Sequence, residues 1–289
     1  MTPRCNICGS REFEDYKGRP GEMCISCKGK ARHRVGLTVY ENLLFPVINA
    51  NPGARVLHMA PEPSLYPVLS KRLGAAYTVS DAEPERYPYA PCLRLNFPED
   101  FSHFPDGYFH GIIHNHILEH IAGHFGDHLK EFARLLAPGG RMIFSFPGPY
   151  SGIETIEGGE FMATDEERIF EFGMPEHIKI FGPDFYDIYA KLPGGFPMND
   201  GVTDELRGEL NVRPGMAPFH VWQRDGASYA DFGDRCENDR PGQPCQSGGH
   251  APNCTCRREI GTVRLNWPET DYHPPTCQPV PPRGADGTA

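Results

Sequence analysis

Short apolar runs alternate with stretches of helical periodicity over residues 54–224. The runs that read as strands lie at residues 55–59, 77–80, 111–114, 141–146 and 219–222. Ahead of them, apolar positions at helical spacing predict a helix over 35–48, which the sequence NPG at 51–53 ends. Strands that alternate with helices form parallel sheets with helices on their faces. The pattern therefore predicts an α/β fold.

Two further segments flank this region. Residues 1–34 hold four cysteines and end in a basic stretch, and they read as a separate small module. Residues 226–289 are rich in proline and glycine, so we expect an irregular tail in which only 262–267 has the character of a strand. The sequence thus divides into a module at 1–34, a domain at 35–225 and a tail at 226–289.

The composition is that of a globular protein, with 39% hydrophobic and 23% charged residues in a chain of 289. No apolar run is long enough to span a bilayer, and the first residues lack a secretory pattern, so a reducing cytoplasm is expected. The formal net charge of −10 argues against a nucleic-acid partner, because such proteins present basic surfaces. A local basic patch over residues 28–34 leaves that alternative open.

The first cysteines form two CxxC pairs, Cys5 with Cys8 and Cys24 with Cys27. This spacing is typical of one tetrahedral Zn²⁺ ion held by four thiolates. Four protein ligands leave no open coordination position, so we predict a structural metal. Two unrelated thiol pairs or a redox site are the alternatives. The cysteines of the tail follow no zinc spacing, and disorder or packing between copies of the chain is expected for them: Cys236, Cys245, Cys254, Cys256 and Cys277.

Four stretches then occur in a characteristic order. Residues 56–62 read VLHMAPE, 77–81 read YTVSD, 104–120 read FPDGYFHGIIHNHILEH, and 134–142 read RLLAPGGRM. In this order they resemble class I S-adenosylmethionine-dependent methyltransferases, in particular a subset with an LHxAPE cofactor loop and an N-terminal CxxC/CxxC element. The resemblance implies a Rossmann-like, doubly wound and mostly parallel sheet, with S-adenosylmethionine as the cofactor.

The resemblance also implies which residues bind the cofactor. The acid that ends the second strand, Asp81, corresponds to the one that takes the ribose hydroxyls, and the first loop faces the methionine part. The chain departs from the usual pattern of these enzymes in three places. The first loop lacks the glycines of a GxGxG pattern, Arg94 stands in place of an acid after the third strand, and His110 stands in place of the acid of the FD pair. The predicted cofactor-binding residues are His58, Ala60, Pro61, Glu62, Asp81, Asn96, Phe97 and Asn115.

Methyl transfer to a hydroxyl needs a base, and an imidazole titrates near neutral pH. His116 is the first candidate and His114 the second; a carboxylate acceptor needs no base, and His116 would then orient it. Residues 150–181 occupy the place of a substrate lid in the enzymes that the chain resembles. O-methylation of a small molecule, a carboxylic acid or a sugar hydroxyl, is the leading hypothesis, and basic residues in and near the lid leave an anionic acceptor open. The candidate acceptor-binding residues are Glu119, Arg168, His177, Lys179, Arg32 and Arg34.

Other interpretations remain at this stage. Residues 116–120 match the HxxEH pattern of zinc hydrolases, and His124 and His128 continue it, although Gly123 and Gly126 weaken an unbroken helix. Some rRNA- or tRNA-modifying methyltransferases also join a zinc module to this fold. A protein that only mediates contacts is a third alternative, and a homo-oligomer is open. The lid residues also allow a purely structural interpretation. In it, Thr164 caps a helix, Arg168 pairs with an acid along that helix, and Lys179 lies in solvent.

Overall fold

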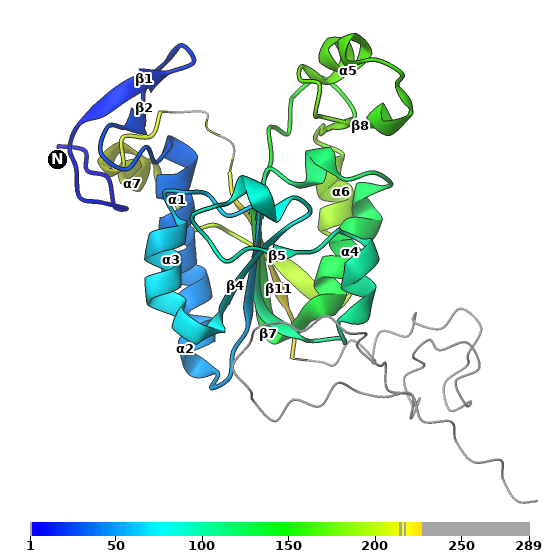
Figure 1. Cartoon of the computed structure of the whole chain (residues 1–289), viewed down its shortest axis with the longest axis horizontal. Helices are drawn as coiled ribbons and strands as arrows, with labels where there is room; N and C mark the ends of the chain where they lie inside the picture. Colours follow the sequence, from blue (N-terminus) through cyan, green and yellow to red (C-terminus); the bar gives the residue numbers. More distant parts are fainter. Residues whose placement is uncertain (1, 214–215, 217, 227–289) are drawn as a thin grey trace, which may run out of the picture.

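The computed structural model describes residues 2–213, 216 and 218–226 (Figure 1). Its centre is a seven-stranded sheet in the order β10–β11–β7–β6–β3–β4–β5. The strands β3 to β7 are parallel, whereas β11 is antiparallel to both of its neighbours. The sheet strands are β3 Val56–Met59, β4 Tyr77–Asp81, β5 Leu93–Arg94, β6 Phe109–Asn115, β7 Leu136–Ser145, β10 Gly195–Met198 and β11 His220–Arg224.

This sheet confirms the predicted Rossmann-like, mostly parallel fold, and all five predicted strands are present in it. The sequence pattern missed two edge strands. β5 has only two residues, and β10, Gly-Phe-Pro-Met, contains a proline and two exposed positions, so neither shows the alternation of buried and exposed residues that predicts a strand. Edge strands of this kind carry little hydrophobic signal because one side of them faces solvent.

Helices cover both faces of the sheet (Figure 1). One face carries a continuous helical run of α1 Ala31–Val39, the π-helix Tyr40–Leu44 and α2 Phe45–Ala50, followed by α3 Tyr66–Leu73. This run contains the helix predicted over 35–48 and begins four residues earlier. The other face carries α4 Phe125–Leu135 and α6 Phe185–Tyr189. None of the helices in the described part of the chain is long and apolar enough to cross a membrane.

Neighbouring residues of the central strand β6 contribute to two different hydrophobic cores. Ile112 packs in the core that includes Leu129 and Phe132 of α4, and Ile113 packs in the core that includes Val35 of α1. Side chains alternate between the faces of a strand, so a central strand that is buried on both sides is apolar throughout. Short helical turns complete this part: Gly74–Ala76, Pro84–Arg86, Glu99–His103 and Leu118–His120.

The N-terminal module contains a hairpin of β1 Phe13–Tyr16 and β2 Arg19–Cys24. Arg34 of α1 is fully buried beneath it and donates to the carbonyls of Gly29, Leu210 and Asn211 at 2.9, 2.6 and 2.8 Å. The last two carbonyls follow α7 Asp204–Glu209. One guanidinium therefore joins the module to a segment that precedes the last strand.

The predicted lid segment forms a substructure of its own. It contains β8 Ile156–Glu157 paired with β9 Lys179–Ile180, the turn Gly159–Phe161 and the helix α5 Asp165–Phe172. Thr164 caps this helix in a capping box with Glu167, as the sequence indicated. The hairpin of the N-terminal module and the α5–β8 region stand at the same end of the molecule, on either side of the sheet (Figure 1).

The direction of winding reverses between β3 and β6, because the chain adds β4 and β5 on one side and β7 on the other. Ligands of open α/β sheets bind beyond the carboxyl ends of the strands at such a reversal. Ala60 follows β3 and His116 follows β6, and both have a left-handed backbone with φ of 50° and 54°. Such angles are uncommon for residues other than glycine and often occur at functional sites.

Candidate active site

A cavity of about 510 Å³ lies at the carboxyl ends of β3, β4 and β6. Its size is within the range of small-molecule sites. Four of the residues predicted to act at the site line it, namely Ala60, Asp81, Phe97 and His116. The other lining residues are Met59, Ala82, Glu83, Arg86, Tyr87, Leu95, Ile117, His120, Ile121, Ala122 and Glu176.

Asp81 is oriented by its own loop. Its Oδ1 accepts from the backbone N–H of Glu83, and its Oδ2 accepts from the hydroxyl of Tyr87, both at 2.8 Å. Burial and the nearby Asp81 raise the pKa of Tyr87, which therefore stays a protonated donor. Each carboxylate oxygen has a second lone pair, so Asp81 retains the capacity to accept from a vicinal diol. The carboxylate and the apolar walls of this cavity fit the ribose and adenine of S-adenosylmethionine.

The cofactor loop itself is arranged differently from the prediction. Glu62 lies with its Oε2 at 3.1 Å from His58 Nε2, and its Oε1 accepts from Asn115 Nδ2 at 3.1 Å. His58 Nδ1 lies 2.6 Å from the Tyr77 hydroxyl. Burial raises the pKa of the Glu62 carboxyl, but the hydrogen bond and charge of His58 outweigh it and hold the pKa well below its usual range.

This network places Glu62, His58 and Asn115 behind the wall of the cavity and not on its surface. Asn115 also donates to the Tyr40 hydroxyl at 2.7 Å and accepts from Ser145 at 3.1 Å, so both hydrogens of its amide nitrogen are used within the protein. In this structure these side chains support the loop, and their direct contact with the cofactor stays a prediction. Pro61 and Asn96 likewise do not line the cavity.

A second cavity of about 840 Å³ lies between the N-terminal hairpin, the lid and the end of β7. Cationic side chains from several segments face it: Lys17, Arg19, Arg32 and Arg213. Glu22 is the acid among its lining residues. Arg32, one of the predicted acceptor contacts, has a buried Nε without a hydrogen-bond partner among the described residues. The remaining lining residues are His116, Ser145, Phe146, Pro147, Gly148, Pro149, Tyr150, Met174, His177, Tyr186, Met216, Pro218 and Phe219.

His116 lines both cavities. Its Nδ1 lies 3.2 Å from Oε1 of Glu119, and that carboxylate is 1% exposed. A carboxylate at Nδ1 fixes the orientation of an imidazole and leaves Nε2 for the ligand, as in other paired histidines. His116 is thus positioned at the boundary between the two cavities.

His114, the second candidate base, is in the wrong place for that role. Its ring is fully buried and is stacked on Phe132 and Phe144, with centroids at 4.4 and 4.6 Å. Burial lowers its pKa to about 3. The side chains of a strand alternate between faces, and His114 points into the hydrophobic core that the helix α4 covers.

Three predicted acceptor contacts are engaged elsewhere. The guanidinium of Arg34 is occupied by backbone carbonyls, as described above. Arg168 donates to Pro175 and Met162 carbonyls at 2.8 and 3.0 Å and pairs with Asp165, so it holds the lid together. Lys179 is buried and donates to the Ile121 carbonyl, neither in solvent nor in the large acceptor cavity, although it lines a smaller adjoining one. By contrast, His177 lines the large cavity.

The HxxEH interpretation requires one continuous helix over residues 116–128, and the structure does not have one. Residues 118–120 form a single 3-10 turn, and α4 begins only at Phe125, after His124 has accepted from the Gly126 N–H as its cap. His116 has a left-handed backbone that no α-helix contains. The histidines of this segment therefore do not share one helical face.

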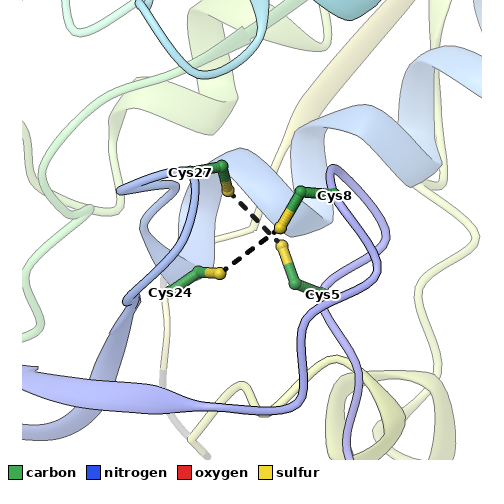
Figure 2. Close-up of side chains that lie close together, drawn as sticks. All are labelled: Cys5, Cys8, Cys24 and Cys27. Atoms are coloured by element: carbon green, nitrogen blue, oxygen red, sulfur yellow. Dashed lines mark hydrogen bonds between the residues drawn. The ribbon is translucent and has the colours of Figure 1, made fainter.

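The four N-terminal cysteines converge on one point, and Figure 2 shows their side chains directed toward one another. The sulfurs of Cys5 and Cys27 are 3.7 Å apart, and those of Cys8 and Cys24 are 3.6 Å apart. All four lie within 4.8 Å of one another as free thiols. Zn–S bonds of about 2.3 Å in a tetrahedron place sulfurs about 3.8 Å apart, so the arrangement fits a structural zinc ion.

Several lining residues gave no signal in the sequence. Lys17 and Arg19 lie on the hairpin between the two CxxC pairs, where the sequence indicated only a connecting loop. Tyr87 and Arg86 lie in a turn between two strands. Their place at the site depends on contacts between distant segments, and no local pattern encodes such contacts.

Residues 64–144, from the loop after β3 to the end of β7, match a family model described as a methyltransferase domain. With the strand order and the cavity at the reversal point, this match supports a class I S-adenosylmethionine-dependent methyltransferase. No curated protein matches the chain.

Several solved structures, methyltransferases among them, are similar to this chain at TM-scores below 0.5. A SAM-dependent methyltransferase from Archaeoglobus fulgidus is 15% identical, with a TM-score of 0.42 and coverage of 68% of this chain and 95% of that one. YcgJ protein from Bacillus subtilis is 11% identical, with a TM-score of 0.37 and coverage of 68% and 100%. CurJ carbon methyltransferase is 15% identical, with a TM-score of 0.39 and coverage of 66% of this chain and 55% of that one. This chain therefore spans about half of that protein. Such low identities bear on the fold alone.

Proposed function

We propose that this protein transfers the methyl group of S-adenosylmethionine to an oxygen atom of a small anionic acceptor. The observation that carries the proposal is the position of His116, which lines both the cavity next to Asp81 and the cationic cavity beneath the N-terminal hairpin. An in-line displacement needs the donor and acceptor on opposite sides of one methyl group. Two cavities that meet at one imidazole support that geometry.

Each part of the chain has a role in this proposal. Asp81 accepts the ribose hydroxyls, and Phe97 and Leu95 contribute apolar walls for the adenine. The bound cofactor supplies an electrophilic sulfonium methyl. His116, oriented by Glu119, accepts the proton of an acceptor hydroxyl, or positions an acceptor that is already a carboxylate. Tyr150 and His177 from the lid close the acceptor side against water.

The charge of the acceptor cavity supports an anionic acceptor. Its cationic residues come from four places in the sequence: the turn after β1, the start of β2, the helix α1 and the segment before β11. The Nε of Arg32 has no hydrogen-bond partner within the described part of the chain, and it is a donor suited to a carboxylate or phosphate oxygen. The overall charge of −10 makes this local cationic surface selective for small anions over long polyanions.

We also propose that Cys5, Cys8, Cys24 and Cys27 bind one structural Zn²⁺ ion. The sulfur separations support a closed thiolate site. The ion would organise the loops that carry the hairpin, and the hairpin supplies Lys17 and Arg19 to the acceptor cavity. Zinc would thus shape the acceptor side without taking part in the chemistry.

The first experiment measures binding of S-adenosylmethionine to the full-length protein by calorimetry, followed by a screen with cofactor labelled in its methyl group. The screen contains small carboxylates, sugars, phosphorylated sugars and RNA. We expect binding of the cofactor and transfer to an anionic small molecule. Absence of cofactor binding overturns the methyltransferase assignment, whereas transfer to RNA alone overturns the small-molecule acceptor and favours a base-modifying enzyme.

A further inference from the structure

A second group of metal-ligating side chains lies apart from the four cysteines. One ligand atom from each of Glu119, His120 and His177 lies within 4.8 Å of the others. Glu119 and His120 belong to the turn after β6, whereas His177 comes from the lid, shortly before β9. His177 is far from the other two residues in the sequence, so only the fold brings the three side chains together.

The carboxylate of Glu119 is unusual in its surroundings. Its side chain is 1% exposed, and neither oxygen has a hydrogen-bond partner in residues 2–213, 216 and 218–226. A buried carboxylate without such a partner is costly unless a cation or a proton compensates it. The nearest cationic candidates are imidazoles, His116 at 3.2 Å and His120 at 4.0 Å.

The ring of His120 is oriented as in a metal ligand. Its Nδ1 lies 2.8 Å from the backbone carbonyl of Glu176, and its Nε2 points toward Glu119. Donation from Nδ1 to a carbonyl fixes the tautomer in which Nε2 carries the lone pair, and metal-bound histidines are commonly held in this way. The ring of His177 lies beside it, with a centroid distance of 4.9 Å.

We propose that Glu119, His120 and His177 bind one divalent first-row transition metal ion. Two imidazoles and one carboxylate are a donor set that suits Zn²⁺, Fe²⁺ or Co²⁺ and leaves coordination positions open. Bonds of about 2 Å require ligand atoms about 3.3 Å apart, so the side chains close by about 1.5 Å at most on binding. Each carboxylate has about four lone-pair sites, so Glu119 can ligate a metal ion and remain close to His116 Nδ1.

The open positions of this ion would face the place where the substrates meet. His120 lines the cofactor cavity, His177 lines the acceptor cavity, and Glu119 lines a smaller cavity of about 240 Å³ between the lid and β7. An oxygen of an acceptor in the cationic cavity is therefore a suitable further ligand. Binding of the metal itself does not depend on methyl transfer.

The test uses Co²⁺ as the probe and the full-length protein. Cobalt bound by thiolates gives an intense charge-transfer band, whereas cobalt bound by nitrogen and oxygen gives only weak ligand-field bands. Cobalt content after equilibrium dialysis is compared between the wild type and His120→Ala, His177→Ala and Glu119→Gln. We expect each variant to bind one ion fewer per chain or to bind it at least about tenfold more weakly, with the thiolate band unchanged.

His103→Ala is the matched control, because His103 is exposed and lines none of the three cavities. The readout is a difference between variants, so any cobalt bound by the tail cancels. His120 is 38% exposed, so its substitution leaves folding intact, which circular dichroism verifies. Equal cobalt content in the wild type, His120→Ala and His177→Ala overturns the proposal, and it does so whether or not the protein methylates anything.

Discussion

Nδ1 of His116 lies 3.2 Å from Oε1 of Glu119, at the point where the cavity beside Asp81 and the cationic cavity meet. The pairing joins a partly exposed imidazole to a buried carboxylate three residues later, on the turn Leu118–His120. His116 has a left-handed backbone and follows the last residue of β6, and its side chain lines both cavities.

Substitution of His116 separates its two proposed roles. For His116→Ala we expect turnover with a hydroxyl acceptor to fall by about 10²–10⁴-fold, because a general base is lost. With a carboxylate acceptor the loss should stay below about tenfold, since no proton is removed. Steady-state rates with the labelled cofactor measure both, and His103→Ala serves as the control. Unchanged turnover with a hydroxyl acceptor contradicts the role of His116.

Asp81 is the predicted anchor of the ribose. We expect Asp81→Ala to weaken S-adenosylmethionine binding by about 10–100-fold, because hydrogen bonds to a charged group contribute about 1.5–3 kcal/mol. Calorimetric titration gives the Kd directly. Asp187→Ala, an exposed acid in the first turn of α6, should bind the cofactor as the wild type does. Equal affinity of the two variants would place the ribose elsewhere.

Arg32 tests the charge of the acceptor. The variant Arg32→Gln should raise KM for an anionic acceptor by about 10–100-fold and leave the cofactor Kd within about twofold, because only the acceptor cavity loses a charge. Arg11→Gln is the control, an exposed residue of the same module that lies outside the cavity. A neutral analogue of the acceptor should not distinguish the two variants; if it does, Arg32 supports the fold and not the acceptor.

Loss of the zinc ligands should reach the acceptor cavity through the hairpin. Cys24 is fully buried at the end of β2, and we expect Cys24→Ser to lose one zinc ion per chain. The Tm should fall by on the order of 10 °C. Because Lys17 and Arg19 lie on this hairpin, KM for the acceptor should rise while cofactor affinity persists. Cys92→Ser, outside the cluster, should keep its zinc, and equal metal content in both variants refutes the site.

His114 should govern stability in acid and not catalysis. Burial lowers its pKa to about 3, whereas an unfolded histidine titrates near 6.5. The unfolded state therefore binds the proton first, and stability is lost as the pH falls from about 6.5 toward 3. By pH 4.5 the loss from this residue is about 2–3 kcal/mol.

The variant His114→Phe removes this titration and matches the stacked environment of Phe132 and Phe144. We expect its free energy of unfolding, measured with urea at pH 7 and pH 4.5, to change less with pH than that of the wild type. Methyl transfer at pH 7 should be retained. An unaltered pH dependence would mean that other buried histidines, such as His33 and His220, dominate the acid response.

The sequence predicted the main strands of the sheet and the cysteine cluster, because the signals for both lie within short segments of the chain. Apolar runs fixed β3, β4, β6, β7 and β11, and two CxxC pairs predicted the sulfur cluster, since both signals depend on spacing within a short segment. Ala60, Asp81 and His116 lie at one cavity because they directly follow or end parallel strands, and their roles there stay predictions. The tail, with its predicted strand at 262–267 and its cysteines, lies outside the described residues.

Only the tertiary structure decided what the polar residues contact. His114 and His116 are two positions apart, yet one is buried between phenylalanines and the other faces two cavities, because the strand ends between them. Glu62 lies close to His58 and accepts a hydrogen bond from Asn115, and Arg34 donates to a backbone carbonyl after α7. A buried charge takes the partner that compensates its desolvation, and the identity of that partner depends on packing between segments far apart in the chain.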